Sequence, residues 1–263
     1  MYYETLMRVA KNVVEARRQL LADLLQNGRY LALDRICQEL SISPATARRD
    51  LVELERSGRV KRTPGGAMTR FTDRFPTFHD RLNVQAPAKQ ALARQVLPYL
   101  RSGFTVYIDG GTTPYAVARL LPEADIPGLK VVTNSLPVVD FLSSTSVDLH
   151  VLGGSLVPRQ SLLLGAEAVH SLRDRKFDVA ILGAEGLTQA GVWNSAPKVV
   201  ELQRAVIRQS RQSFILLTSD KLGKQAASLL APLGEPLRLI TDASAKQMEA
   251  QQIPVSMLQE RNR

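Results

Sequence analysis

Two adjacent arginines, Arg48 and Arg49, lie within the stretch "SISPATARRDLVELERSGRVKRTPGGA" that begins at Ser41. Ser43 is a favourable N-cap residue and Pro44 suits the first helical position, so both arginines are expected in the first turns of a helix. Cationic groups there contact the bases and phosphates of DNA when such a helix enters the major groove. A second basic segment follows the helix. We predict a DNA-contacting set made of Ser43, Thr46, Arg48, Arg49, Lys61 and Arg62.

A second group with binding chemistry is the segment "DGGTTP", which begins at Asp109. Gly110 and Gly111 allow a ligand to approach the backbone closely, and the two threonines that follow supply hydroxyl groups. Pro114 favours the first turn of a helix, whose free N–H groups and dipole attract an anion such as phosphate. The alternative is a tight strand-to-helix turn that holds no ligand.

Other short polar loops offer further donors and acceptors, including "TNS", "LGG" and the glutamate of "LGAEG". The chain has neither a GxGxxG fingerprint nor a P-loop, which disfavours a nucleotide and favours a small phosphorylated metabolite. We predict an effector-binding set made of Asp109, Gly110, Gly111, Thr112, Thr113, Thr133, Asn134, Ser135, Gly153, Gly154 and Glu185.

Three short helices and a basic wing are predicted to position the arginines. The first helix carries Val13, Ala16, Leu20 and Leu24 at helical spacing and ends at Gly28. The second helix, "LALDRICQEL", would bury Leu33, Ile36, Cys37 and Leu40. The third would bury Ala47, Leu51 and Leu54. "RVKRTPGGA" then forms a hairpin or wing. The alternatives are a solvated amphipathic helix and a winged helix that binds protein.

The rest of the chain alternates short apolar runs with helical stretches. The runs are "FTVYIDGGTT", "KVVTNS", "LHVLGG", "FDVAILGAEG", "SFILLTSDK" and "LRLITD". Runs of this length separated by helices predict a mainly parallel sheet covered on both faces, an α/β fold. Ligands bind outside the carboxyl ends of such strands, so the polar loops should converge on one site.

Composition and charge agree with a basic module joined to a nearly balanced one. Residues 1–75 hold 14 lysines and arginines against 9 acids, a net charge of +5; residues 76–263 hold 20 against 16, a net charge of +4.

Cys37 is the only cysteine, which excludes an intrachain disulfide and a cysteine-based metal cluster. No histidine has a partner at metal-ligand spacing. The apolar runs are too short to span a bilayer and the start lacks a signal-peptide pattern, so a cytoplasmic protein is expected.

These motifs together resemble the DeoR family of bacterial transcription regulators. "SISPATARRDLVELERSGRVKRTPGGA" is similar to the family's winged helix-turn-helix, and "DGGTT", "VVTNSLPV", "VLGGSL" and "LGAEG" follow its effector domain in order. That domain is similar in fold to sugar-phosphate isomerases of the ribose-5-phosphate isomerase kind and binds phosphorylated sugars as inducers. The resemblance implies a DNA-binding domain over residues 1–70, a linker with one short element over 71–86, and an effector-binding and oligomerisation domain over 87–263.

Three positions of the effector domain depart from the family pattern. Glu185 stands where the resemblance places an Asp, Gln203 where it places a Lys, and Thr218 where it places an Asp. The polar end of the pocket is therefore altered.

Two functions follow from these observations. The first is a transcription regulator, which by the default of the resembled family represses a carbohydrate operon. It is expected to bind double-stranded operator DNA as a dimer or tetramer and to be released by a phosphorylated sugar, with no cofactor, metal or membrane. The second is an isomerase-like enzyme with an accessory DNA-binding-like domain. Isomerisation needs a carboxylate base and a cation that stabilises the enediolate. Glu185 is the candidate base, and Lys198 or Lys221 the candidate cation. We favour the regulator.

Overall fold

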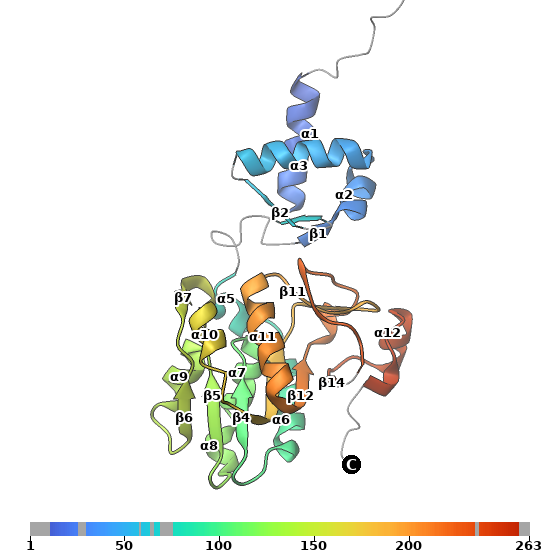
Figure 1. The fold of residues 1–263 in the computed structure, drawn as a ribbon. Helices are drawn as coiled ribbons and strands as arrows, with labels where there is room; N and C mark the ends of the chain where they lie inside the picture. Colours follow the sequence, from blue (N-terminus) through green and yellow to red (C-terminus); the bar gives the residue numbers. More distant parts are fainter. Residues whose placement is uncertain are drawn as a thin grey trace, which may run out of the picture. The chain divides into compact units, whose positions relative to one another are not determined.

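A computed structural model describes residues 11–25, 30–57, 59–63, 66–68, 76–234 and 237–257, of which the side chains of residues 11, 12, 61, 63, 68 and 257 are not described. The chain divides into two compact units, Met1–Phe75 and Pro76–Arg263 (Figure 1). Each unit has its own hydrophobic core.

The first unit contains three helices and a small antiparallel sheet. The helices are α1 (Lys11–Leu24), α2 (Leu33–Leu40) and α3 (Pro44–Arg56), and the strands are β1 (Tyr30–Ala32), β2 (Lys61–Thr63) and β3 (Gly66–Met68), in the order β1-β3-β2. The predicted winged helix-turn-helix is therefore confirmed. The residues before Leu33 form β1 rather than the start of the second helix, because they pair with β3.

The core of this unit lies between the three helices. Ile36 of α2 and Leu51 of α3 are buried in it, as predicted. The predicted inner face of α1 was wrong: Val13 is 52% exposed and Leu20 is 58% exposed, whereas Leu21 is fully buried. The buried row lies one residue further along the helix, and the partly buried Arg17 and Arg18 lie beside it. The predicted helix end at Gly28 lies outside the described residues.

The second unit is built on a six-stranded parallel sheet. Its strands are β4 (Thr105–Ile108), β5 (Lys130–Thr133), β6 (Asp148–Val151), β9 (Phe177–Gly183), β12 (Ser210–Leu216) and β14 (Leu237–Ile240), in the order β14-β12-β9-β4-β5-β6. Every neighbouring pair is parallel. The six predicted strands and the parallel α/β fold are confirmed. The strand order brings β4 and β9 side by side in the middle of the sheet, so the loops after them are neighbours.

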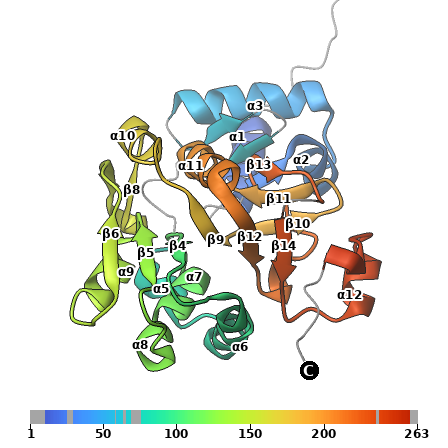
Figure 2. The ribbon, with the colours of Figure 1, turned by 60° about the horizontal axis from the view of Figure 1, so that its bottom comes forward.

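Helices cover both faces of this sheet (Figure 2). One face packs against α6 (Ala86–Val96), α7 (Thr112–Ala118), α8 (Leu121–Ala124) and α9 (Leu136–Leu142). The other packs against α10 (Ala166–His170), α11 (Pro197–Gln209) and α12 (Ala245–Ala250). Side chains alternate between the two cores, as strand geometry requires: Val106 and Ile108 face the first group, and Tyr107 faces the second.

Smaller elements complete the unit. A hairpin joins β7 (Ser155–Val157) to β8 (Leu162–Leu164), and an antiparallel sheet contains β10 (Gly186–Thr188), β11 (Gly191–Asn194) and β13 (Ser228–Ala231). Short helices are α5 (Phe78–Leu82), η2 (Leu97–Tyr99), η3 (Pro158–Gln160), η4 (Ser219–Lys221) and η5 (Val255–Met257). None of the helices in the described part of the chain combines the length and apolar character that a bilayer-spanning segment needs.

Candidate functional site

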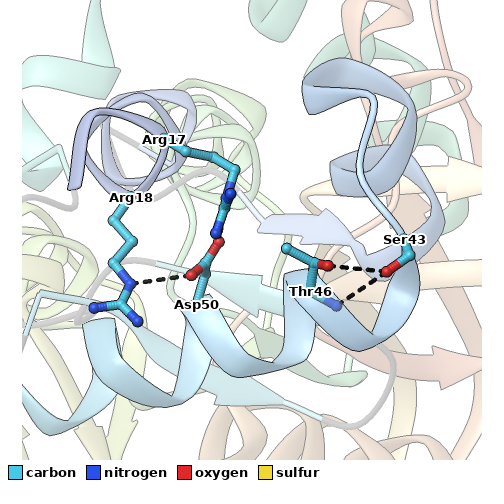
Figure 3. Close-up of polar contacts among 5 residues, drawn as sticks. All are labelled: Arg17, Arg18, Ser43, Thr46 and Asp50. Carbon is cyan, nitrogen blue, oxygen red and sulfur yellow. Dashed lines mark hydrogen bonds and ion pairs between the residues drawn. The ribbon is translucent and has the colours of Figure 1, made fainter. Parts of the chain in front are cut away.

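The N-terminal turn of α3 gathers four of the predicted DNA-contacting residues. Ser43 caps the helix: its hydroxyl accepts a hydrogen bond from the backbone N–H of Thr46 at 3.3 Å, and the two hydroxyl oxygens lie 2.9 Å apart (Figure 3). Arg48 and Arg49 follow within one turn, and both side chains are exposed. The capped, positively charged first turns of α3 are available to a polyanion.

One flank of α3 is fastened to α1 by a buried carboxylate. Asp50 accepts hydrogen bonds from the Nε atoms of Arg17 at 2.6 Å and Arg18 at 3.0 Å (Figure 3), and its side chain is only 2% exposed. The hydrogen bond to Asp50 raises the pKa of Arg17 above its ordinary value. The sequence analysis did not assign a role to these three residues.

The other flank of α3 is joined to the wing. The backbone N–H and the Nε of Arg62 donate to the two carboxylate oxygens of Glu55, at 2.9 and 2.6 Å. Arg62, predicted to contact DNA, is thus held against α3 and remains exposed. Lys61 lies in β2, but its side chain is outside the described part of the structure.

In the second unit, the loop after β4 is tied to the end of β9 and to α11 by buried polar groups. Asp109 accepts hydrogen bonds from Nε2 of Gln203 at 2.6 Å and from the backbone N–H of Gly183 at 3.2 Å. Asn194 donates to Oε1 of Gln203 at 2.7 Å. Burial raises the pKa of Asp109, and the hydrogen bond from Gln203 opposes that shift. Gln203 therefore hydrogen-bonds the buried carboxylate of Asp109 inside the protein.

The two glycines of "DGGTT" differ in their surroundings. A Cβ at Gly110 would lie 1.7 Å from Cδ2 of Leu162, which comes from β8. A Cβ at Gly111 would lie 3.2 Å from Cδ of Pro114 and 4.0 Å from Cα of Gly183. The absence of a side chain at Gly110 is thus required by the packing of β8. Thr112 and Thr113 are both buried in the first turn of α7.

The predicted residues after β5 are also engaged in internal hydrogen bonds. Thr133 donates to the carbonyl of Ile108 at 2.6 Å, and Tyr107 donates to Oδ1 of Asn134 at 2.9 Å. Ser135 caps α9. These contacts join the ends of β4 and β5 and fix the shape of the carboxyl edge.

The predicted glycines after β6 lie beside the hairpin and α10. A Cβ at Gly153 would meet Ser171, and one at Gly154 would meet the backbone of Leu164 at 2.9 Å. Gly154 also has φ of +133°, which favours glycine. Both positions therefore shape the turn into the hairpin.

Three cationic side chains outside the predicted effector-binding set, Arg81, Lys89 and Lys221, lie near one another, and Glu185 is close to two of them, Arg81 and Lys221. Nζ of Lys221 donates to the carbonyl of Ala184 at 2.8 Å, and Nζ of Lys89 donates to the carbonyl of Arg81 at 2.6 Å. Burial lowers the pKa of both Arg81 and Lys221, and the charge of Glu185 opposes each shift.

Lys89 shows the electrostatic character of this cluster most clearly. Burial, followed by the neighbouring charges of Lys221 and Arg81, lowers its pKa to about 8. Glu185 accepts a short hydrogen bond from the hydroxyl of Ser195. The cluster of Arg81, Lys89 and Lys221, hereafter the cationic cluster, thus gathers three cationic side chains, with the carboxylates of Glu185 and Asp220 nearby.

Lys221 follows β12 in the chain, and the sequence analysis named it only as a candidate cation of the isomerase alternative. Arg81 and Lys89 precede the first strand of the sheet, in α5 and α6, and no pattern in the sheet indicates them.

A cavity of about 300 Å³ adjoins this cluster between α6 and α7. Lys89 and Thr112 line one part of it, and the charged residues Arg94, Arg119 and Glu123 line another. Its lining therefore carries more positive than negative charge. Its volume is at the lower end of that of small-molecule sites.

Metal ligands do not gather in the described part of the chain: no group of three or more His, Cys, Asp or Glu side chains there could hold an ion. His79, His150 and His170 are all exposed.

Comparisons with known proteins match both units. Residues 17–70 match the family model described as the DeoR-like helix-turn-helix domain, and residues 84–243 match the DeoR C terminal sensor domain. The HTH-type transcriptional repressor GlcR of Bacillus subtilis (strain 168) is 30% identical over 230 residues, which cover 87% of this chain and 88% of GlcR. The L-fucose operon activator of Escherichia coli (strain K12) is 28% identical over 232 residues, covering 86% of this chain and 94% of the activator.

A solved structure of D-ribose-5-phosphate isomerase in complex with phospho-erythronic acid was also found. It is 15% identical in sequence, with a TM-score of 0.39, and the match covers 51% of this chain and 52% of that one.

Proposed function

Because the chain belongs to the DeoR family of transcriptional regulators, we propose that it represses a carbohydrate-metabolism operon and leaves its operator when a phosphorylated sugar binds to the second unit. The family membership makes it a DNA-binding regulator and not an enzyme, so the isomerase alternative is set aside. We place its action in the cytoplasm, where operator DNA is accessible.

The DNA-contacting part of the proposal rests on α3. Its first turns carry Arg48 and Arg49 as exposed cations, and Ser43 caps them. The flanks of the helix are occupied by contacts to α1 and to the wing, which leaves the outer face for the major groove. We propose that two copies bind two half-sites, because helix-turn-helix proteins commonly contact DNA as symmetric dimers.

The effector part of the proposal is carried by the cationic cluster. Lys89 and Lys221 are held near each other against their mutual repulsion, by hydrogen bonds to backbone carbonyl groups. A phosphate group placed there would neutralise that repulsion, and charge-assisted hydrogen bonds to phosphate are strong. Glu185 and Ser195 supply oxygen atoms that suit sugar hydroxyl groups.

The predicted loop "DGGTT" has a supporting part in this site. The carboxylate of Asp109 accepts a hydrogen bond from Gln203, and the side chain of Leu162 packs against Gly110. Neither residue is therefore proposed to contact the effector. Thr112 lines the cavity beside Lys89 and is the residue of the loop that we propose to contact it.

The proposal is tested by titration of a preformed protein–DNA complex. An operator is first selected by the protein from a pool of random duplexes, and pentose, hexose and triose phosphates are then added, each beside its unphosphorylated parent. We expect one phosphorylated compound to raise the melting temperature of the protein and to release the DNA. Equal release by the parent sugar would contradict the phosphate site, and tighter DNA binding would contradict release by the effector.

The variant Lys221→Gln locates the site. We expect it to need more effector for release while it binds the operator with wild-type affinity. Lys246→Gln, an exposed lysine on α12, is the matched control and should titrate like wild type. Wild-type titration of Lys221→Gln would place the phosphate elsewhere.

A further inference from the structure

Asp50 is a nearly buried acid on the helix that carries the proposed DNA contacts. Its neighbours in sequence, Arg48 and Arg49, are exposed, whereas its own side chain points to α1 (Figure 3). An acid is an unusual choice at this place, because a negative charge on a DNA-contacting helix repels phosphate. Its presence therefore needs a local explanation.

The geometry of its two ion pairs supplies one. Each carboxylate oxygen of Asp50 accepts one Nε–H: Oδ2 from Arg17 at 2.6 Å and Oδ1 from Arg18 at 3.0 Å. A buried carboxylate is costly unless it is paired and hydrogen-bonded, so Asp50 is stable only when α3 presents it to both arginines together. Apolar contacts such as those of Leu51 and Leu54 are not directional in this way.

The directional contact limits rotation of α3 about its own axis. Successive residues of a helix are separated by about 100°, so fixing Asp50 against α1 fixes the directions of Arg48 and Arg49 as well. Glu55 makes the corresponding contact to Arg62 on the wing. The two contacts hold α3 from both flanks.

We infer that Asp50 is a positioning residue for operator recognition: through Arg17 and Arg18 it sets the orientation in which α3 presents Arg48 and Arg49 to base edges. It does not itself touch DNA. The inference rests on the proposed role of α3, and it goes beyond that role by assigning sequence discrimination to a residue outside the contact surface.

A positioning role and a purely electrostatic role of Asp50 predict opposite changes in operator affinity when the residue is replaced. Asp50→Asn removes one negative charge, which by itself strengthens attraction to every DNA sequence. Loss of orientation instead weakens only the operator complex, because phosphate contacts tolerate small rotations and base contacts do not. The ratio of operator affinity to non-specific affinity separates the two.

The experiment measures that ratio for the full chain at several salt concentrations, with the selected operator and a scrambled duplex. We expect Asp50→Asn to lower the ratio at least about tenfold while binding the scrambled duplex as well as wild type or better. Glu53→Gln is the matched control: it removes the same charge from the same helix, and Glu53 forms an exposed ion pair with Arg56 at 3.0 Å. It should leave the ratio unchanged.

A second variant keeps the test decisive if Asp50→Asn fails to fold. Arg17→Lys with Arg18→Lys preserves both charges but removes the paired Nε–H donors. We expect it to lower the ratio as well, with the salt dependence of non-specific binding unchanged and its circular-dichroism melt cooperative. A wild-type ratio in either folded variant would overturn the inference. If Arg48→Ala and Arg49→Ala also keep the wild-type ratio, the proposed role of α3 is what fails.

Discussion

At the scale of single residues, four arginines of the first unit fall into two pairs, according to whether they form an ion pair with the buried acid Asp50. Arg48 and Arg49 project from α3, whereas Arg17 and Arg18 are turned to Asp50. Four arginines of one small domain thus have two different tasks. Composition alone could not separate them, because the separation depends on which helix face is buried.

The first prediction concerns the exposed pair. Arg49→Ala, or Arg48→Ala, should weaken operator binding by about 1–3 kcal/mol if the residue contacts a base, because a bidentate base contact is lost. Arg56→Ala, at the far end of α3 and paired with Glu53, is the control and should have a much smaller effect. Fluorescence anisotropy with labelled operator measures all three. Wild-type binding by both single variants would contradict the assignment of α3 as the recognition helix.

The second prediction concerns Lys89 and pH. Its pKa in the free protein is about 8, below the usual value for lysine, so it loses its proton as the pH rises through 8. A bound phosphate favours the charged form and raises this pKa. Effector affinity should therefore be greatest below pH 8 and fall by up to about tenfold between pH 7 and pH 9.

Lys89→Met is the comparison for this pH profile. A phosphate monoester has its second pKa near 6, so the ligand itself is fully ionised over that range. The variant should bind more weakly and with a flatter profile, as measured by calorimetry. An identical slope in wild type and variant would show that Lys89 does not contact the phosphate.

At the scale of secondary structure, prediction succeeded where short apolar runs were bounded by polar loops. All six strands of the parallel sheet were found in this way, and so were the capped start of α3 and the wing. Strands β1, β7, β8, β10, β11 and β13 were missed because they are only three or four residues long, and the pairs β1–β3 and β11–β13 also join segments that are distant in sequence.

The site was predicted less completely than the fold. The strand-end loops do lie together at one edge, but the contacts of Asp109 and Gly110 are with Gln203 and Leu162. A glycine that admits a ligand and a glycine that admits a neighbouring side chain are identical in sequence. Only tertiary contacts distinguish them.

The third prediction follows from that distinction. Gly110→Ala places a methyl group where the buried side chain of Leu162 already lies, so that side chain must shift, and we expect a loss of about 1–3 kcal/mol in the free energy of unfolding. Gly153→Ala is the control: its Cβ would lie 3.6 Å from Oγ of Ser171, an ordinary contact. Urea unfolding of the second unit measures both. Equal stability of the two variants would show that Leu162 moves aside at no cost.

At the scale of the whole molecule, the protein consists of two units with separate cores and separate proposed ligands. The second unit begins at Pro76, where the capping box of Thr77 and Asp80 starts α5 and Phe78 is buried. Part of the segment expected to be linker is therefore packed with the effector-binding unit. The cationic cluster depends on that packing, because α5 supplies Arg81.

The fourth prediction concerns this division. Limited proteolysis should cut first between the two units, before Pro76, and should leave a stable fragment that retains Arg81 and binds the effector. Mass spectrometry of the first fragments identifies the cut. A first cleavage inside residues 105–240 would contradict the division, and a fragment from residue 87 onward that binds the effector normally would contradict the role of Arg81.

The fastening of α3 on both flanks also makes the protein a scaffold for engineering. Asp50 and Glu55 hold the helix through contacts that lie away from its outer face. The exposed positions of α3 can therefore be replaced together while these two contacts are kept. A library randomised at Ala45, Arg48 and Arg49, with both acids kept, would sample new operator preferences on an unchanged frame. Coupled to a reporter gene, its members would form a set of orthogonal metabolite biosensors that share one input and drive different promoters.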